Sequence, residues 1–320
     1  MPSFPRHLLV PVSGAMLTRV LTALTVGMSI SMGASAQGRI EVVFSDPGAL
    51  YSAYYADIER VTVAAGANWL QHFLPANATQ VLTVRIGFDA LATATGRSLV
   101  SSFAGVSAGG MNLFSQGAAH ELLTGIDPNG TDADIEIMFG TGGYLQNELW
   151  FDPSPLQRSA PVPSSQTDAY SVLQHEFAHA LGFNGWLDSN TGTVPGNDAS
   201  TFDALVGQHP QGAGTGLYFL GAAAMAAYGG PVPLTDGNYT HFGNWAPGDG
   251  EALLPDLMNG LVFYRGTRYT VSTLDLAVMR DLGLPTVVGI VPEPATALLW
   301  MLGMGALLVG QRRVGERAAV

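Results

Sequence analysis

The residues with the clearest chemical potential lie between His175 and Phe183, where the chain reads HEFAHALGF. Positions i and i+4 of a helix share one face, so His175 and His179 can hold one metal ion between them. Glu176 can then take a proton from a water molecule on that ion, which is the chemistry of zinc hydrolases. The alternative is a buried helix whose histidines only bond to carbonyl oxygens.

The helix that presents this motif is predicted to begin near Thr167 and Asp168 and to run through Leu181. Asp168 suits an N-terminal cap, and Gly182 suits the C-terminal stop. Upstream, alternating apolar residues predict strands, and a period of about 3.6 residues predicts a helix. The predicted strands are Arg39–Ser45, Val81–Phe88 and Asp134–Phe139, and the predicted helix is Leu50–Phe73.

The other segments are less regular. Gly96–Gly117 is rich in glycine and serine and predicts a loop with short strands at most, and Glu148–Asp152 predicts a short edge strand or hairpin partner. From Asn184 onward we expect irregular structure with helices at Leu220–Tyr228 and Thr273–Leu282. The fold class is therefore expected to be α+β. It would have a mixed sheet, a backing helix, the motif helix and an irregular C-terminal part that ends in a helix.

A catalytic zinc ion usually has three protein ligands and one open position for water, so two histidines are not sufficient. The pattern HExxHxxGxxH would place a third histidine at position 185, which is Gly185. Downstream, His241 and Glu251 are the main candidates. His241 lies in an aromatic stretch and could be a packed core histidine, while the Pro247–Gly250 segment argues against a helix at Glu251. Three other histidines are predicted to be surface or capping residues: His72, His120 and His209.

A wider pattern surrounds the motif. HEFAHALGF is followed, after a long insertion, by a histidine, then by LM, then by a helix that ends in DLG. This order resembles the leishmanolysin-like metzincins, over roughly residues 165–284. The resemblance implies a metzincin-like zinc protease with Glu176 as general base and Met258 as the turn methionine beneath the metal. It also implies three zinc ligands, which are His175, His179 and His241.

Two functions compete for this pattern. The first is a zinc-dependent endopeptidase, in which a zinc-activated water attacks a peptide bond and Glu176 is the general base. A protein or peptide substrate would pair with an exposed sheet edge, expected near Asp134–Phe139. Tyr264 and Tyr269 are unassigned candidates for a hydrogen bond to the oxyanion. The second is a non-catalytic surface or matrix protein with a structural metal site. Glu176 favours the enzyme, because a structural site needs no base.

Asp127 to Asp134, reading DPNGTDAD, is a possible second ion site. Alternating carboxyl and carbonyl oxygens could bind calcium, but the spacing misses the EF-hand pattern and has no closing glutamate. We therefore expect an ordinary turn before a strand, with calcium as the secondary alternative.

The N-terminus has the pattern of a secretory signal peptide. Arg6 and Arg19 give a basic start, the run Leu21–Met32 is apolar, and Ala34–Ala36 has the A-x-A form of a signal-peptidase site. These features predict export, with cleavage after residue 36.

The C-terminus has a second targeting pattern. Pro292–Pro294 reads PEP, Ala295–Gly310 carries no charge, and Arg312 and Arg313 follow. This order resembles the PEP-CTERM sorting signal of Gram-negative bacteria. The resemblance implies a transient inner-membrane anchor, processing by an exosortase-type enzyme, and release to the cell surface or extracellular matrix. A plain membrane anchor is the alternative.

The composition excludes several classes of partner and of site. Residues 37–294 contain eight arginines, no lysine and 24 acidic residues, a net charge of −16. Such a surface repels nucleic acid, which we therefore exclude as a partner. The chain has no cysteine, so thiolate nucleophiles and cysteine zinc sites are also excluded.

The expected organisation is a signal peptide (1–36), a subdomain with the sheet and motif helix (37–183), a subdomain with the third ligand and methionine turn (184–289), and a sorting tail (290–320).

Overall fold

The computed structural model describes residues 38–77, 79–209, 216–243, 253–261 and 263–287. These residues belong to one compact unit that begins at Ala36. The signal peptide and the sorting tail predicted from the sequence lie outside the described residues. Within the described part of the chain, no helix is long and apolar enough to cross a membrane.

The main sheet has four strands in the order β1–β2–β6–β3. These strands are β1 (Arg39–Ser45), β2 (Val81–Asp89), β6 (Ile135–Gly140) and β3 (Ala94–Ser98). The first three run parallel, and β3 runs antiparallel to β6, so the sheet is mixed. Alternate side chains of β2 and β6 are fully buried, which explains why the sequence pattern predicted both strands. The expected α+β class is confirmed.

The exposed edge of this sheet is not where the sequence placed it. Strand β6 is bonded to a neighbour on each side, so the prediction of a free edge at Asp134–Phe139 was wrong. The edge strand on that side is β3, whose sequence ATGRS has little of the apolar alternation that marks a strand. Its Gly96 is required by packing, because a Cβ there would lie 2.6 Å from the Cβ of Glu176.

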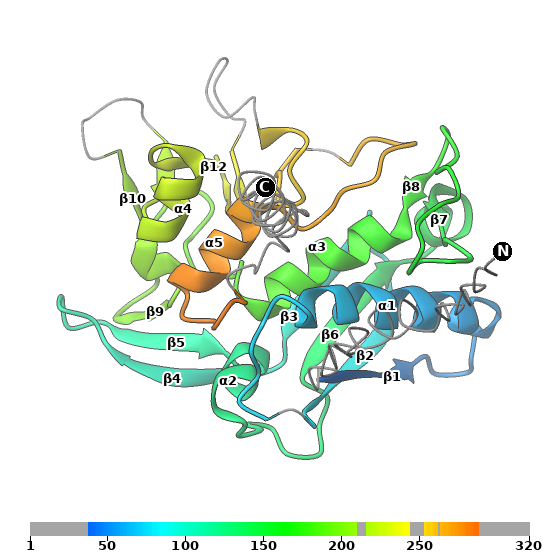
Figure 1. Cartoon of the computed structure of the whole chain (residues 1–320), viewed down its shortest axis with the longest axis horizontal. Helices are drawn as coiled ribbons and strands as arrows, with labels where there is room; N and C mark the ends of the chain where they lie inside the picture. The colour runs from blue at the N-terminus through cyan, green and yellow to red at the C-terminus, as the bar shows by residue number, and fades with distance from the viewer. Residues whose placement is uncertain (1–37, 78, 210–215, 244–252, 262, 288–320) are drawn as a thin grey trace, which may run out of the picture. The chain divides into compact units, whose positions relative to one another are not determined.

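Helices α1 (Tyr55–Leu70) and α3 (Ala169–Leu181) pack against the sheet and against each other (Figure 1). Their contact is close at Gly66, where a Cβ would lie 2.7 Å from both Ile40 of β1 and Phe177 of α3. The indole N–H of Trp69 also donates to the carbonyl of Gln174 over 2.8 Å. Helix α1 is therefore the helix that the sequence predicted to back the sheet, and it also contacts the motif helix.

A second sheet extends from the Gly96–Gly117 region. It comprises the hairpin of β4 (Ser101–Val106) and β5 (Asn112–Gln116), to which β9 (Asp198–Ser200) adds in parallel. Helix α2 (Gly117–Thr124) follows directly. This region is thus more regular than predicted, because its pairing depends on a strand some ninety positions away rather than on local pattern.

Short elements lead into the motif helix. One turn of π-helix, Tyr144–Glu148, precedes β7 (Leu149–Trp150), which pairs in parallel with β8 (Thr167–Asp168). Strand β7 corresponds to the short strand predicted at Glu148–Asp152. Two single turns of 3-10 helix, Ser52–Tyr54 and Asp203–Leu205, complete the minor elements described here.

The C-terminal part contains a small antiparallel sheet, although irregular structure was expected. Its strands are β10 (Val206–Gln208), β11 (Leu217–Phe219), β12 (Val232–Thr235) and β13 (Asn238–Phe242). Strands of three to five residues are too short to show alternation. The two predicted helices are confirmed as α4 (Ala222–Tyr228) and α5 (Thr273–Asp281). One continuous core joins both halves, from Ile40 to Leu284.

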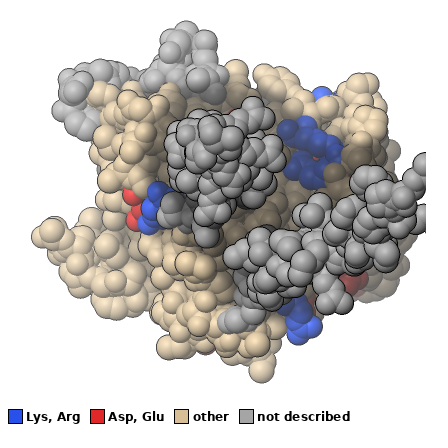
Figure 2. Space-filling view, in the orientation of Figure 1, with Lys and Arg blue, Asp and Glu red and all other residues tan. Residues whose placement is uncertain are grey.

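Charged side chains are few, and seven of the eight arginines in the described residues form ion pairs with carboxylates. In Figure 2 they form small separate groups on the face shown. Ion pairs join arginines to carboxylates along the described chain: Arg39–Glu41, Arg60–Asp57, Arg85–Glu136, Arg97–Glu136, Arg158–Asp168, Arg265–Glu148 and Arg268–Asp152.

Candidate metal centre

Three imidazoles meet at one point between α3 and β13. His175 and His179 come from successive turns of α3, and His241 comes from β13. The Nε2 atom of His175 lies 3.0 Å from that of His241 and 3.1 Å from that of His179, and the third Nε2–Nε2 distance is 3.1 Å. These residues can therefore hold a metal ion. The structure brings together all three histidines that the sequence singled out as ligands.

The spacing of these nitrogens fits zinc. Tetrahedral ligands at the usual zinc–nitrogen distance of 2.0–2.1 Å lie about 3.3 Å from one another. Three nitrogens at 3.0–3.1 Å meet this requirement with small adjustments. Among the described residues, no fourth carboxylate or imidazole joins the group. The donor set is thus the three-ligand kind that leaves one coordination position open.

The second nitrogen of each imidazole is held by a hydrogen bond that fixes the ring. Nδ1 of His175 lies 2.8 Å from the carbonyl of Leu257, and Nδ1 of His179 lies 2.5 Å from the carbonyl of Phe183. Nδ1 of His241 lies 3.3 Å from the hydroxyl of Thr240. A carbonyl only accepts, so the first two Nδ1 atoms carry the proton and leave Nε2 free as a metal ligand.

Burial keeps the three rings neutral. Burial, together with the nearby His179, lowers the pKa of His175 to about 3, and burial lowers the pKa of His179 to about 4. The pKa of His241 is lowered well below its usual value by burial and by the other two imidazoles. Neutral imidazole is the form that binds metal, so the site is ready for an ion across the physiological pH range.

Glu176 lies beside this group and lines the same cavity as the three histidines. Only 6% of the residue is exposed, and burial raises the pKa of its carboxyl to about 8. The backbone N–H of Gly96 in β3 opposes this shift by donating to the carboxyl. A divalent cation nearby would favour the carboxylate further. The carboxyl is therefore poised to gain and lose a proton near neutral pH.

Position 185 is closed to a ligand for a steric reason. A Cβ at Gly185 would lie 2.8 Å from Cγ of Asp203, whose carboxylate accepts the backbone N–H groups of Trp186 and Ser200. A side chain there would displace this buried carboxylate. The rival ligand Glu251 lies outside the described residues.

The other histidines lie elsewhere. His72 precedes Phe73, and burial lowers its pKa, while His120 is on α2, where its carbonyl accepts the hydroxyl of Thr124. The ring of His209 lies 5.1 Å from that of Tyr218. These three side chains do not line the cavity of the candidate metal centre.

The turn at Leu257 and Met258, which follows β13 in the chain, is hydrogen-bonded to the site. The carbonyl of Leu257 holds His175, and the carbonyl of Met258 accepts the backbone N–H of Phe242, next to His241. Met258 is fully buried and lies in this turn. The carboxylate of Asp256 fixes the turn by accepting the N–H of Met258 over 3.0 Å.

An open cavity of about 570 Å³ lies over the three histidines. Sequence reasoning missed several side chains in its wall, chiefly the segment 93–96 at the edge strand, Tyr144 and Phe263. Burial and the charge of Glu176 raise the pKa of Tyr144, so its phenol is a neutral donor near the base. Tyr144 belongs to the π-helical turn, a feature common at functional sites that the sequence does not show.

The two tyrosines considered from the sequence are not in this wall. Tyr269 is buried, and its hydroxyl accepts the backbone N–H of Tyr264, whose own side chain is 49% exposed. Both tyrosines therefore stay unassigned. Their sequence positions near the predicted methionine turn gave no information on side-chain direction.

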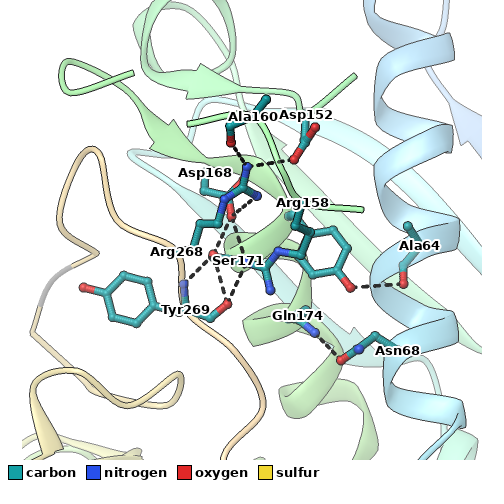
Figure 3. A network of polar contacts seen from close by, with 11 residues as sticks. Ala64, Asn68, Asp152, Arg158, Ala160, Asp168, Ser171, Gln174, Arg268 and Tyr269 are labelled. Atoms are coloured by element: carbon teal, nitrogen blue, oxygen red, sulfur yellow. Dashed lines mark hydrogen bonds and ion pairs between the residues drawn. The ribbon is translucent and has the colours of Figure 1, made fainter. Parts of the chain in front are cut away.

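A buried polar network fixes the start of α3 (Figure 3). Asp168 occupies the N-cap position, as predicted, but its carboxylate does not bond to the helix N–H groups. It instead accepts the hydroxyl of Ser171 over 2.7 Å and a guanidinium N–H of Arg158 over 3.3 Å. Arg268 bonds to Asp152 over 2.9 Å and lies 3.8 Å from Asp168. The network joins the motif helix to the segment just before it, which carries Arg158, and to the distant loop that carries Arg268.

Comparisons of the chain with models of known protein families, with curated proteins and with solved structures found no match. The assignment of chemistry to this site consequently rests on the geometry of the described residues.

Proposed function

We propose that the protein is a zinc-dependent endopeptidase with a metzincin-like active site. The observation that carries the proposal is the convergence of three neutral imidazole nitrogens beside Glu176, in an open cavity. The position of His241 far beyond the motif helix and the buried turn at Met258 support the resemblance to leishmanolysin-like enzymes.

The bound zinc ion would supply a Lewis acid that polarises the peptide carbonyl and acidifies a water molecule. Glu176 would accept the proton of that water and pass it to the leaving amine. Its burial suits this cycle, because a carboxyl with a pKa raised toward neutrality can both take and return a proton. The hydrogen bond from Gly96 holds the carboxyl in place.

The substrate would lie extended along β3. This strand has one side bonded to β6 and forms part of the cavity wall through residues 93–96. Main-chain hydrogen bonds along such an edge recognise a peptide without regard to sequence. The edge of β3 would thus pair with the extended substrate, a role that the sequence assigned to Asp134–Phe139.

The two predicted targeting sequences support an exported protein that is sorted to the cell surface or matrix by an exosortase-type enzyme. A non-catalytic matrix protein with a structural metal site is the competing function. The three-ligand donor set favours the enzyme, because structural zinc sites have four protein ligands.

Glu176→Gln tests the proposal. The variant should bind one zinc ion per chain, as the wild type does, and lose chelator-sensitive cleavage of a protein substrate by about 10²-fold or more. Glu59→Gln makes the same chemical change at an exposed position of α1 and should leave cleavage unchanged. Undiminished cleavage by Glu176→Gln would refute Glu176 as the base. Zinc binding that survives in His241→Ala would refute the ligand assignment.

A further inference from the structure

A second group of acidic side chains lies away from the histidine cavity. Glu121 is on α2, Asp127 follows that helix, and Asp134 immediately precedes β6. Each offers a carboxylate oxygen within 4.8 Å of the other two. Glu121 and Asp134 are only 6% and 4% exposed, whereas Asp127 faces solvent. Two buried carboxylates at this distance repel each other unless a proton or a cation lies between them.

Gln80 gives an independent indication of a missing ligand. It is only 6% exposed, and neither its side-chain oxygen nor its side-chain nitrogen has a hydrogen-bond partner. Its amide lies against the carboxyl of Glu121, close enough to lower the pKa of that group. The backbone of Gln80 is fixed, because its carbonyl accepts the N–H of Arg39 over 2.8 Å. A buried amide without a partner is strongly unfavourable, which points to a ligand at this place.

Asn129 adds a further free oxygen. Its side-chain nitrogen donates to the carbonyls of Asp132 and Ala133, and its side-chain oxygen is buried without a partner. One oxygen of Asp127 accepts the N–H groups of Asn129 and Gly130, which confirms the turn predicted here. The second carboxylate oxygen of Asp127 remains available to an ion.

We propose that Glu121, Asp127, Asp134 and Gln80 form a calcium site. Calcium takes six to eight oxygen ligands at 2.3–2.6 Å in flexible geometry, and carboxylates and amide carbonyls are the ligands it prefers. The exposed side at Asp127 allows water to complete the shell. Magnesium requires smaller and near-octahedral coordination, which side chains from four separate segments are poorly suited to provide.

The sequence indicated only part of this site, because Asp127 and Asp134 belong to the DPNGTDAD stretch but Glu121 and Gln80 lie outside it. Glu121 lies on the preceding helix and Gln80 precedes β2, so the EF-hand spacing is irrelevant to it. An ion here would join α2 to the starts of two neighbouring strands of the main sheet, β2 and β6. Without an ion, burial and the charge of Asp134 raise the pKa of Glu121 to about 8, so a proton takes the place of the cation.

Calcium titration of the full chain tests the proposal. The protein is first freed of metal and then supplied with one equivalent of zinc, so that the histidines are occupied. Addition of calcium at pH 8 should give saturable heat in calorimetry with one site per chain. It should also raise Tm by roughly 5–10 °C at a hundred times the dissociation constant. Magnesium should bind at least about tenfold more weakly.

Glu121→Gln and Asp134→Asn keep the shape of each side chain and remove one charge. Each should weaken calcium binding by at least about tenfold and leave the zinc content unchanged. Glu59→Gln is the matched control and should bind calcium as the wild type does. Weak extracellular calcium sites have dissociation constants of up to about 1 mM. The proposal is overturned if the wild type shows no saturable response at roughly ten times that calcium concentration. It is equally overturned if both variants respond like the wild type.

Discussion

Arg268 offers a quantitative test of the network that holds the motif helix. Its side chain is 19% exposed, and it bonds to Asp152 and lies near Asp168, both of which are fully buried. It also lies 5.2 Å from the ring centre of Trp150, so methionine is the substitution that best keeps the packing. Arg268→Met leaves the carboxylate of Asp152 buried without its cation. Removing one partner of a buried ion pair costs about 3–5 kcal/mol.

The lower end of that range applies here, because Asp152 keeps the backbone N–H of Ser154 as a donor and Asp168 keeps Arg158. A change of about 3 kcal/mol corresponds to a fall in Tm of roughly 6–12 °C for a domain of this size. Arg39→Met is the matched control, since Arg39 and Glu41 form an ion pair with side chains 67% and 47% exposed. Such surface pairs contribute about 0–1 kcal/mol.

Both variants would be compared with the wild type by scanning calorimetry in zinc-containing buffer at one protein concentration. A Tm that falls no more in Arg268→Met than in Arg39→Met would contradict a stabilising role of the buried ion pair. The same contradiction would follow if Asp152→Asn combined with Arg268→Met is no closer to wild-type stability than Arg268→Met alone, because the double variant has no unpaired buried charge at this pair.

Three further predictions concern other parts of the structure. Gly96→Ala should displace β3 from the motif helix and lower stability by about 1–3 kcal/mol in urea unfolding. Gly109→Ala is the control and should have no such effect, because its Cβ would meet only the hydroxyl of Ser107, at an ordinary contact distance of 3.8 Å. In calcium-free buffer, the raised pKa of Glu121 should make this carboxyl subtract from stability progressively as pH rises from about 4.5 to about 8, and Glu121→Gln should reduce that loss. Equal slopes of stability against pH for the two proteins would contradict the buried carboxyl pair. Removal of zinc by a chelator should lower Tm by roughly 8–16 °C if zinc had been present at a thousand times its dissociation constant. The Tm of His241→Ala should not respond to the chelator. A wild-type Tm that is equally insensitive would argue against the metal centre.

Local pattern was enough to predict the elements that bury one continuous face. The apolar alternation of Val81–Asp89 and the periodicity of Tyr55–Leu70 mark the strand and helix that the structure shows, because both are core elements. Strand β3 has no such pattern. Its position is set by hydrogen bonds to β6 and by the contact of Gly96 with Glu176, and both partners lie far along the chain.

The candidate site likewise contains residues that the sequence could identify and residues that it could not. His175, Glu176 and His179 are related by helical spacing, which a sequence shows directly. His241 could be selected only through a resemblance, since its place depends on how β13 packs beside α3. Tyr144 and the Gln80–Glu121 pair are brought to their sites by tertiary structure, so spacing alone could not identify them.

The three histidines have a further consequence for a chain without cysteine. The ring nitrogens of His179 and His241 meet across 62 positions of sequence. A bound ion would close this segment into a loop, as a disulfide does, and would reduce the conformational freedom of the unfolded chain. For a loop of that length the entropy model of cross-linking gives on the order of 4 kcal/mol. Unlike a disulfide, this cross-link resists reducing agents, and its strength depends on the zinc concentration around the protein.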